Sequence, residues 1–207
     1  EKDKVEVIYP WVDISFIKPI EKENNWFLKE HGLLDKKVIL YSGNMGVTHD
    51  LKTVLKTAKK LNASINNFHF LFIGDGAQKD SLVTYKEDNN LTNVTFLPYQ
   101  DPEVLPFSFG SADFGIVSLG KGAEGLSVPS KTFYMLATGA AIISISKLNS
   151  EVSNLVKENN CGVSILPSDH ENLLEFLTSI NDNDLKKYKQ NSINLSNHFT
   201  HKNAYKF

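Results

Sequence analysis

The stretch VILYSGNMGVTHDLKTVLKTAKKL, residues 38–61, combines an apolar run, a glycine-rich turn and an amphipathic segment in immediate succession. Residues 38–42 form the short apolar run that is typical of a strand buried inside a sheet. In residues 50–61 apolar side chains recur at helical spacing, with lysines on the opposite face: Leu51, Val54, Leu55, Ala58 and Leu61. A strand, a tight turn and a surface helix in this order predict a parallel βα unit.

The same alternation continues through most of the chain. We expect further strands at residues 68–74, 93–98, 114–119, 140–145 and 162–166, and further helices at 77–88, 131–139, 150–159 and 170–180. This order predicts an α/β fold, a Rossmann-like parallel sheet of about six strands with helices on both faces.

We expect residues 1–207 to form one domain, with a leading segment (1–36), a Rossmann-like core (37–180) and a terminal helical segment (181–207). The chain does not begin with methionine and its last pattern runs close to Phe207, so both ends are expected to be cuts within a longer protein. The terminal segment is a candidate to pack on a domain absent from this sequence. Trp11 and Trp26 are expected to anchor the leading segment to the core.

The composition excludes several classes of protein. The chain has 22 basic and 24 acidic residues, so nucleic acid is not an expected partner. Every basic residue is a lysine, so a phosphate would be held by lysine, backbone N–H groups or a helix N-terminus. The single Cys161 cannot form an internal disulfide, and no metal-ligand spacing occurs. No run approaches the roughly 18 apolar residues of a membrane span and the first residues are charged, so we expect a cytoplasmic protein.

Ligands of open parallel sheets bind outside the carboxyl ends of the strands, where this sequence has two glycine-rich turns. In SGNMGVTHD (42–50), Gly43 and Gly46 either let backbone N–H groups approach a diphosphate or serve tight turning alone. The turn IGDG (73–76) is open to the same two readings. The G-x-G-x-x-G fingerprint follows none of the strands, which disfavours an NAD-dependent dehydrogenase.

A third loop, SLGKGAEGLSVPSK (118–131), carries charge. Glu124 either hydrogen-bonds sugar hydroxyls or is a solvated loop charge. Pro129 and Ser130 are typical of a helix start, with Ser130 as the N-cap. Lys131 near that helix N-terminus supplies a positive charge for phosphate.

These segments, together with VIYPWVD (7–13), FLPYQDPEVLPFSFGSADFGI (96–116) and PSKTFYMLATGAAIIS (129–144), resemble the C-terminal, donor-binding domain of family 4 (group 1) glycosyltransferases of the GT-B fold. The similarity is greatest to the subgroup that builds bacterial O-antigen, colanic acid and capsule polysaccharides. It extends over residues 5–180.

The resemblance implies a hexosyltransferase whose N-terminal acceptor domain is absent here, so the fragment alone is expected to be inactive. The donor is a nucleoside diphosphate sugar, with UDP favoured over GDP. The acceptor is a lipid-linked saccharide, reached through the missing domain at the inner face of the membrane. Transfer would retain the anomeric configuration and need no cofactor or metal.

The resemblance also implies roles for individual residues. Glu124 and Lys131 would be catalytic. The remaining residues would bind the donor, with the diphosphate near the first turn and the nucleobase beside residues 97–99: Ser42, Gly43, Asn44, Gly46, His49, Gly74, Leu97, Tyr99, Gly125, Leu126, Ser127, Val128 and Ser130.

The sequence departs from the family pattern at two places. Asn44 and His49 stand where many members have lysine or arginine, and Leu126 and Tyr134 stand where the family has its E-x7-E pair. Glu124 lies two residues before the first of these positions, while Tyr134 is expected to pack in the core. A sugar-nucleotide epimerase half and a non-catalytic sugar-nucleotide-binding module stay open as alternatives.

Overall fold

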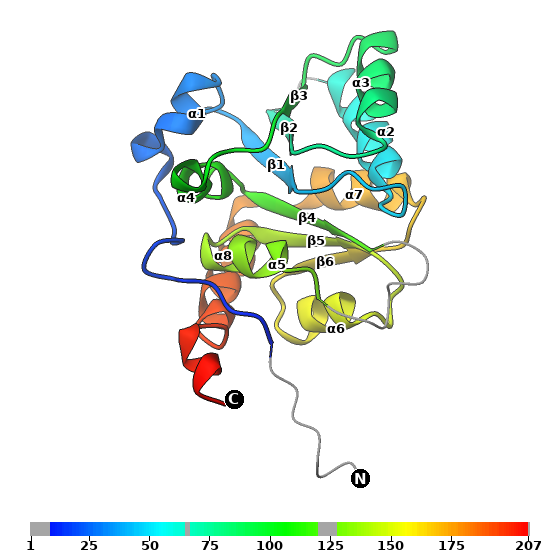
Figure 1. Cartoon of the computed structure of the whole chain (residues 1–207). Helices are drawn as coiled ribbons and strands as arrows, with labels where there is room; N and C mark the ends of the chain where they lie inside the picture. Colours follow the sequence, from blue (N-terminus) through cyan, green and yellow to red (C-terminus); the bar gives the residue numbers. More distant parts are fainter. Residues whose placement is uncertain (1–8, 65–66, 120–127, 207) are drawn as a thin grey trace.

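The computed structural model describes residues 9–64, 67–119 and 128–206, and these contain one six-stranded parallel sheet (Figure 1). The strand order is β3-β2-β1-β4-β5-β6. The strands are β1 (Lys37–Ser42), β2 (Phe68–Ile73), β3 (Val94–Leu97), β4 (Phe114–Ser118), β5 (Ala141–Ile145) and β6 (Gly162–Ile165). The predicted Rossmann-like α/β fold is therefore confirmed.

Helices cover both faces of this sheet (Figure 1). They are α1 (Trp26–Glu30), α2 (Leu51–Asn62), α3 (Lys79–Asp88), α4 (Leu105–Phe109), α5 (Lys131–Ala137), α6 (Glu151–Glu158), α7 (His170–Ser179) and α8 (Asp182–Ser196), with short 3-10 turns η2 (Lys22–Asn24), η3 (Pro102–Val104) and η4 (His201–Lys206). One apolar cluster joins the sheet to α2, α3 and α7, and the other joins it to α1, α4, α5 and α6. Both faces of the central strands are covered, which explains their continuous apolar runs.

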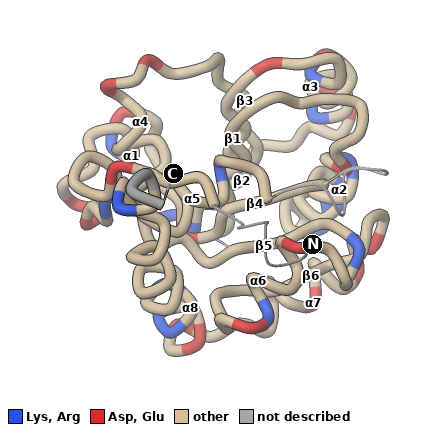
Figure 2. The backbone as a smooth tube through the Cα atoms, turned by 60° about the horizontal axis from the view of Figure 1, so that its bottom comes forward, with Lys and Arg blue, Asp and Glu red and all other residues tan. Residues whose placement is uncertain are grey.

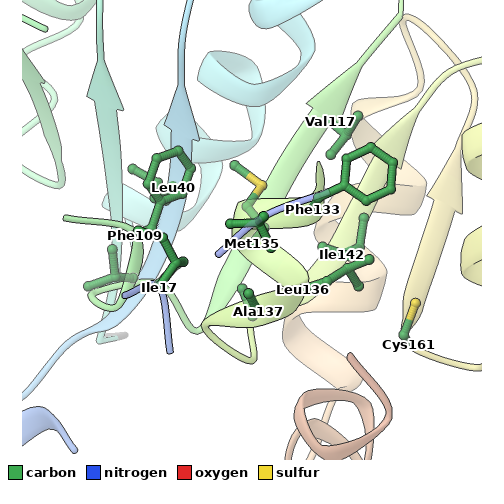
Figure 3. Packing of buried hydrophobic residues seen from close by; sticks show 14 of the residues in the cluster. Ile17, Leu40, Phe109, Val117, Phe133, Met135, Leu136, Ala137, Ile142 and Cys161 are labelled. Atoms are coloured by element: carbon green, nitrogen blue, oxygen red, sulfur yellow. The ribbon is translucent and has the colours of Figure 1, made fainter. Parts of the chain in front are cut away.

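Helix α5 is fixed on the sheet by a dense apolar layer (Figure 3). Phe133, Met135 and Leu136 are each 1% exposed or less. They lie in one cluster with Val117 of β4 and Ile142 of β5. This packing determines where the first residue of α5 lies relative to the ends of the strands.

The buried carboxylate of Asp113, just before β4, joins both ends of the chain to the sheet. It accepts hydrogen bonds from Lys22 Nζ at 2.6 Å, Lys189 Nζ at 3.1 Å and the backbone N–H of Val38 at 2.9 Å. Nearby, the hydroxyl of Ser192 donates to the carbonyl of Ala140. Helix α8 therefore packs on this sheet and on α5. The expected contact of the terminal segment with a domain absent from this sequence stays a prediction.

The buried residues Val12 and Phe27 anchor the leading segment, while the adjacent Trp11 and Trp26 are 40% and 43% exposed. The Trp26 ring also packs on Phe107 of α4, with ring centroids 5.3 Å apart, as expected for an anchoring residue. The sequence did not predict α4, which has five residues and a proline in its first turn. The Asp101–Pro102 pair that begins η3 was the only available signal.

Acidic and basic residues both occur on the outer helices α3, α6 and α8, as the red and blue parts of the backbone tube in Figure 2 show. This mixture is consistent with the net charge of −2. In the described part of the chain, no helix has the length and apolar character needed to cross a membrane.

Candidate functional site

The turns after β1 and β2 pack directly against each other at the carboxyl end of the sheet. The N–H of Gly43 donates to the carbonyl of Ile73 at 2.9 Å, and the N–H of Met45 donates to the carbonyl of Asp75 at 2.7 Å. A Cβ on Gly74 would overlap the carbonyl oxygen of Gly43. The glycine at position 74, a predicted donor-binding residue, is thus required for packing between the two turns.

Lys131, the first residue of α5, extends its side chain to the turn after β1. Its Nζ lies 3.8 Å from the centre of the Tyr41 ring, and a Cβ built on Gly43 would lie 3.3 Å from it. The nitrogen is buried, and among the described residues it has no hydrogen-bond partner. The structure therefore joins two of the predicted site residues, Gly43 and Lys131.

The electrostatics of Lys131 are unusual for a lysine. Burial lowers the pKa of its amine from 10.5 to about 7. A buried ammonium without a carboxylate is costly, and a bound anion would relieve that cost by favouring the charged form. This arrangement suits a site whose counter-charge arrives with a ligand.

His49 lies later in the same turn, just before α2. Its Nδ1 is 2.7 Å from the carbonyl oxygen of Ser118 at the end of β4. Its Cδ2 would lie 3.5 Å from a Cβ on Gly46. Desolvation by burial lowers the pKa of His49, and the nearby Lys131 charge lowers it further, although the Ser118 hydrogen bond opposes both effects.

The side chain of Asp50 is occupied by the start of α2 and by the turn after β6. It accepts hydrogen bonds from the N–H of Thr53 at 3.3 Å and from the N–H of Ser168 at 2.6 Å. Its own N–H donates to the hydroxyl of Ser118 at 2.9 Å. These bonds hold His49 and the N-terminus of α2 against the ends of β4 and β6.

A cavity of about 570 Å³ opens beside His49, between α2 and the turns after β5 and β6. This volume lies within the usual range for small-molecule sites. The cavity is lined by polar and apolar groups from five segments: Val47, Thr48, His49, Asp50, Lys52, Gln78, Leu119, Lys147, Pro167 and Ser168.

For the remaining described site residues we report no direct contact with Lys131 or His49. Leu97 ends β3 and packs partly against the core, while Tyr99 is 58% exposed near the same edge. Val128 is buried. Ser130 precedes α5, but its side chain makes no capping hydrogen bond, which corrects the expectation of a serine N-cap. Ser42, at the end of β1, is buried.

Four predicted residues lie outside the described part of the chain: Glu124, Gly125, Leu126 and Ser127. Their roles stay predictions. Sequence reasoning had no signal for Ser118 or for Gln78, whose side-chain amide donates to the carbonyls of Gly46 and His49. It also did not assign Tyr41 a role, although Tyr41 lies next to the SGNMG turn. Within residues 9–64, 67–119 and 128–206, no group of His, Cys, Asp and Glu is arranged to hold a metal ion.

The fold and these turns define a Rossmann-like α/β domain with a cavity of mixed polar and apolar lining at the carboxyl edge of its sheet. The family described as "Glycosyl transferases group 1" matches residues 24–196. The chain belongs to this family.

Individual relatives agree with that assignment. The chain is 24% identical to "Probable glycosyltransferase WbjE" of Pseudomonas aeruginosa over 175 residues, which are 84% of this chain and 43% of WbjE. It is 31% identical to "Putative colanic acid biosynthesis glycosyl transferase WcaI" of Escherichia coli K12 over 121 residues, which are 58% of this chain and 29% of WcaI. The chain therefore spans less than half the length of these curated relatives.

Among solved structures, the Anabaena protein Alr3699/HepE in complex with UDP-glucose superimposes with a TM-score of 0.79 at 14% identity. The match covers all of this chain and 58% of the Anabaena chain. At this identity the likeness shows a shared fold, that of the GT-B glycosyltransferases.

Proposed function

We propose that this chain is the donor-binding domain of a glycosyltransferase and that it holds the diphosphate of a nucleoside diphosphate sugar between the SGNMG turn and Lys131. The observation that carries the proposal is the buried Lys131 amine, which lies over Tyr41 beside Gly43 and has no hydrogen-bond partner among the described residues. An anion placed there would receive the lysine charge, together with N–H groups of the turn other than those of Gly43 and Met45, which donate to the carbonyls of Ile73 and Asp75.

The positive charge of Lys131 would have a role in glycosyl transfer. The bond between the anomeric carbon and the β-phosphate oxygen breaks, and its electron pair stays on the diphosphate. The acceptor hydroxyl oxygen bonds to the anomeric carbon, and its proton passes to the released diphosphate. Lys131 would stabilise the negative charge that grows on the leaving group, which lowers the barrier because the interaction strengthens in the transition state.

We further propose UDP as the favoured nucleotide. The support is the likeness to the Anabaena protein, whose structure contains UDP-glucose. The nucleobase would lie beside Leu97 and Tyr99, where the exposed Tyr99 ring offers a stacking surface.

The rest of the reaction needs residues beyond this chain. The acceptor, a lipid-linked saccharide in surface polysaccharide synthesis, would be held by a second domain of the longer protein at the cytoplasmic face of the inner membrane. The name of WcaI, a colanic acid biosynthesis transferase, supports this process. Transfer with retention and without a cofactor or metal belongs to the same proposal.

Calorimetric titration of the 207-residue chain with UDP, GDP, ADP and NAD tests the proposal. We expect weak binding of UDP, little binding of NAD, and no transfer by this chain alone because half of the reaction cleft is missing. Tighter binding of NAD than of UDP would contradict the proposal. Robust transfer by the purified chain would refute the assignment as a donor domain alone.

The two alternatives are separated by a different experiment, on the longer protein. A non-catalytic module predicts that the longer protein binds UDP-sugars without transferring or altering the sugar. An epimerase predicts that the longer protein changes the configuration of the sugar while it stays on UDP. Chromatography of the nucleotide-sugar after incubation with the longer protein and a saccharide acceptor separates both from transfer.

A further inference from the structure

The side chain of Gln78, between β2 and α3, holds the turn after β1 by two hydrogen bonds. Its amide nitrogen donates to the carbonyl of Gly46 and to the carbonyl of His49, the latter at 2.8 Å. A carbonyl oxygen only accepts hydrogen bonds, so the NH2 group faces both carbonyls and supplies one hydrogen to each. The contact joins two distant parts of the chain, because Gln78 lies 32 positions after Gly46.

The backbone around Gln78 extends the same contact. The N–H of Gln78 donates to the carbonyl of Met45 at 3.0 Å. A Cβ on Gly76 would lie 2.5 Å from Asn44 Oδ1 and 2.7 Å from the backbone of Met45, so no side chain fits between the two turns. The turn after β1 therefore rests directly on the residues that lead into α3.

These hydrogen bonds orient the peptide groups of the turn. The peptide bonds there are trans, so each C=O points opposite to the N–H of the next residue. Because the carbonyls of Met45 and Gly46 face Gln78, the N–H that follows each of them points away from it. These N–H groups belong to Gly46 and Val47, and neither donates to an acceptor among the described residues. The turn thus has two backbone donors left for a ligand.

The next peptide group of the turn shows where such N–H groups point. The His49 carbonyl faces Gln78, and the N–H that follows it, that of Asp50, donates to the Ser118 hydroxyl at the end of β4. In the sheet, β2 and β4 lie on opposite sides of β1. Helix α5, which begins at Lys131, packs on β4 and β5. An N–H that points away from Gln78 therefore points to the side of β1 from which the Lys131 side chain approaches.

We propose that Gln78 is a positioning residue of the donor site, which holds the SGNMG turn so that the N–H groups of Gly46 and Val47 are available to the diphosphate. This inference rests on the proposed function, because it requires a diphosphate at this turn. A rotated peptide group would present a carbonyl oxygen, which repels phosphate, in place of an N–H, which attracts it. A turn that is ordered before the ligand arrives also avoids the cost of ordering it on binding.

The test compares the UDP affinity of the 207-residue chain with that of Gln78→Met. Methionine is uncharged and of similar length, so the variant loses both hydrogen bonds without adding a charge beside the diphosphate. Gln190→Met is the matched control, since it removes an exposed amide contact with Asn194 on α8. Thermal midpoints and the nitrogen-15 heteronuclear NOE of residues 46–49 are measured on the same samples.

We expect Gln78→Met to raise the Kd for UDP about fivefold or more, because the binding-competent turn is populated less once its hydrogen bonds are lost. The amides of residues 46–49 should become more mobile, and Gln190→Met should change neither quantity. An unchanged Kd, even with an earlier thermal midpoint, would show a purely structural role and overturn the inference while the proposed function stands. A higher Kd with an unaltered turn would overturn it as well. If UDP does not bind the unmodified chain, both fail.

A measurement on the unmodified chain applies even where Gln78→Met does not fold. Without UDP, the amides of residues 46–49 should already be as rigid on the picosecond-to-nanosecond timescale as those of α2, because Gln78 holds the turn in the free chain. A turn that is mobile in the free chain and becomes rigid only when UDP is added would overturn the inference.

Discussion

The Nζ of Lys131 lies 3.8 Å from the centre of the Tyr41 ring, although the two residues are separated by ninety positions in the sequence. The Tyr41 hydroxyl donates to the carbonyl of Asn44, so the ring is held in place by the same turn that would receive a diphosphate. An aromatic face attracts a cation only weakly compared with a charged hydrogen-bond partner. The Tyr41 ring therefore positions the Lys131 amine but does not supply it with a hydrogen-bond acceptor among the described residues.

Replacement of the amine should separate its effect on binding from its effect on stability. We expect Lys131→Met to weaken UDP binding by about 1–3 kcal/mol, the usual value of a hydrogen bond to a charged group. Methionine preserves most of the apolar stem, so the fold should persist. Lys157→Met on α6 is the control, and equal UDP affinity of both variants would remove Lys131 from the donor site.

The stability of the chain should depend on pH through Lys131. Burial lowers the pKa of this amine from 10.5 to about 7, so between these values the unfolded chain binds a proton that the folded chain has lost. The free energy of unfolding should then rise with pH, by about 1.4 kcal/mol per pH unit from this group alone. Lys131→Met lacks this dependence and should be the more stable variant near pH 7.

Urea denaturation of the unmodified chain and of Lys131→Met at pH 7.5 and pH 9 measures this effect. The stability advantage of the variant should shrink by about 2 kcal/mol between these two pH values. Other titrating groups are shared by the two proteins and cancel in the comparison. An advantage that stays constant would show that the folded chain keeps the Lys131 proton.

The two glycines of the SGNMG turn should respond differently to alanine. Gly43 has a φ of +130°, which alanine rarely adopts, so Gly43→Ala should lower stability by about 1 kcal/mol or more. Gly46 is absent from the positive-φ glycines of the described chain, and its Cβ would lie 3.2 Å from Asn44 Nδ2. Gly46→Ala should therefore fold nearly normally and lose UDP affinity.

Measuring the thermal midpoint and the UDP affinity of both glycine variants decides whether each glycine serves folding or binding. A Gly46→Ala variant that melts early and binds normally would assign this glycine to folding and remove it from the site.

The Asp113 carboxylate should be a main support of the terminal elements. Asp113→Asn removes the negative charge that faces Lys22 and Lys189, and we expect a loss of about 2 kcal/mol or more in stability. Asp182→Asn, which breaks the exposed pair with Lys37, should cost clearly less stability than Asp113→Asn. Equal losses in urea denaturation would contradict this difference.

Local patterns predicted the sheet well because its strands are short apolar runs bounded by glycine and polar residues. The expected strand at 38–42 is observed at Lys37–Ser42, and that at 114–119 at Phe114–Ser118. Helix α4 escaped prediction because five residues do not establish a helical period. The docking of α8 depends on Lys189 and Ser192, whose partners, Asp113 and Ala140, are distant in sequence.

Only part of the site was predicted, because the sequence shows local features but not contacts between distant residues. Turn chemistry drew attention to Gly43, Gly46 and Lys131, since glycine turns and lysine are local features. The burial of Lys131 over Tyr41 and the contact of His49 with Ser118 arise only when β1, β4 and α5 come together. These long-range contacts cannot be predicted from sequence periodicity.

The measurement that tests the central claim most directly is a titration of the nitrogen-15-labelled chain with UDP, followed by amide NMR. Binding at the proposed site predicts saturable shifts at Gly43, Asn44, Gly46 and Lys131, which fail to appear in Lys131→Met at the same UDP concentration. Shifts confined to β6 and α7, or no shifts at millimolar UDP, would contradict the assignment of this edge of the sheet as the donor site.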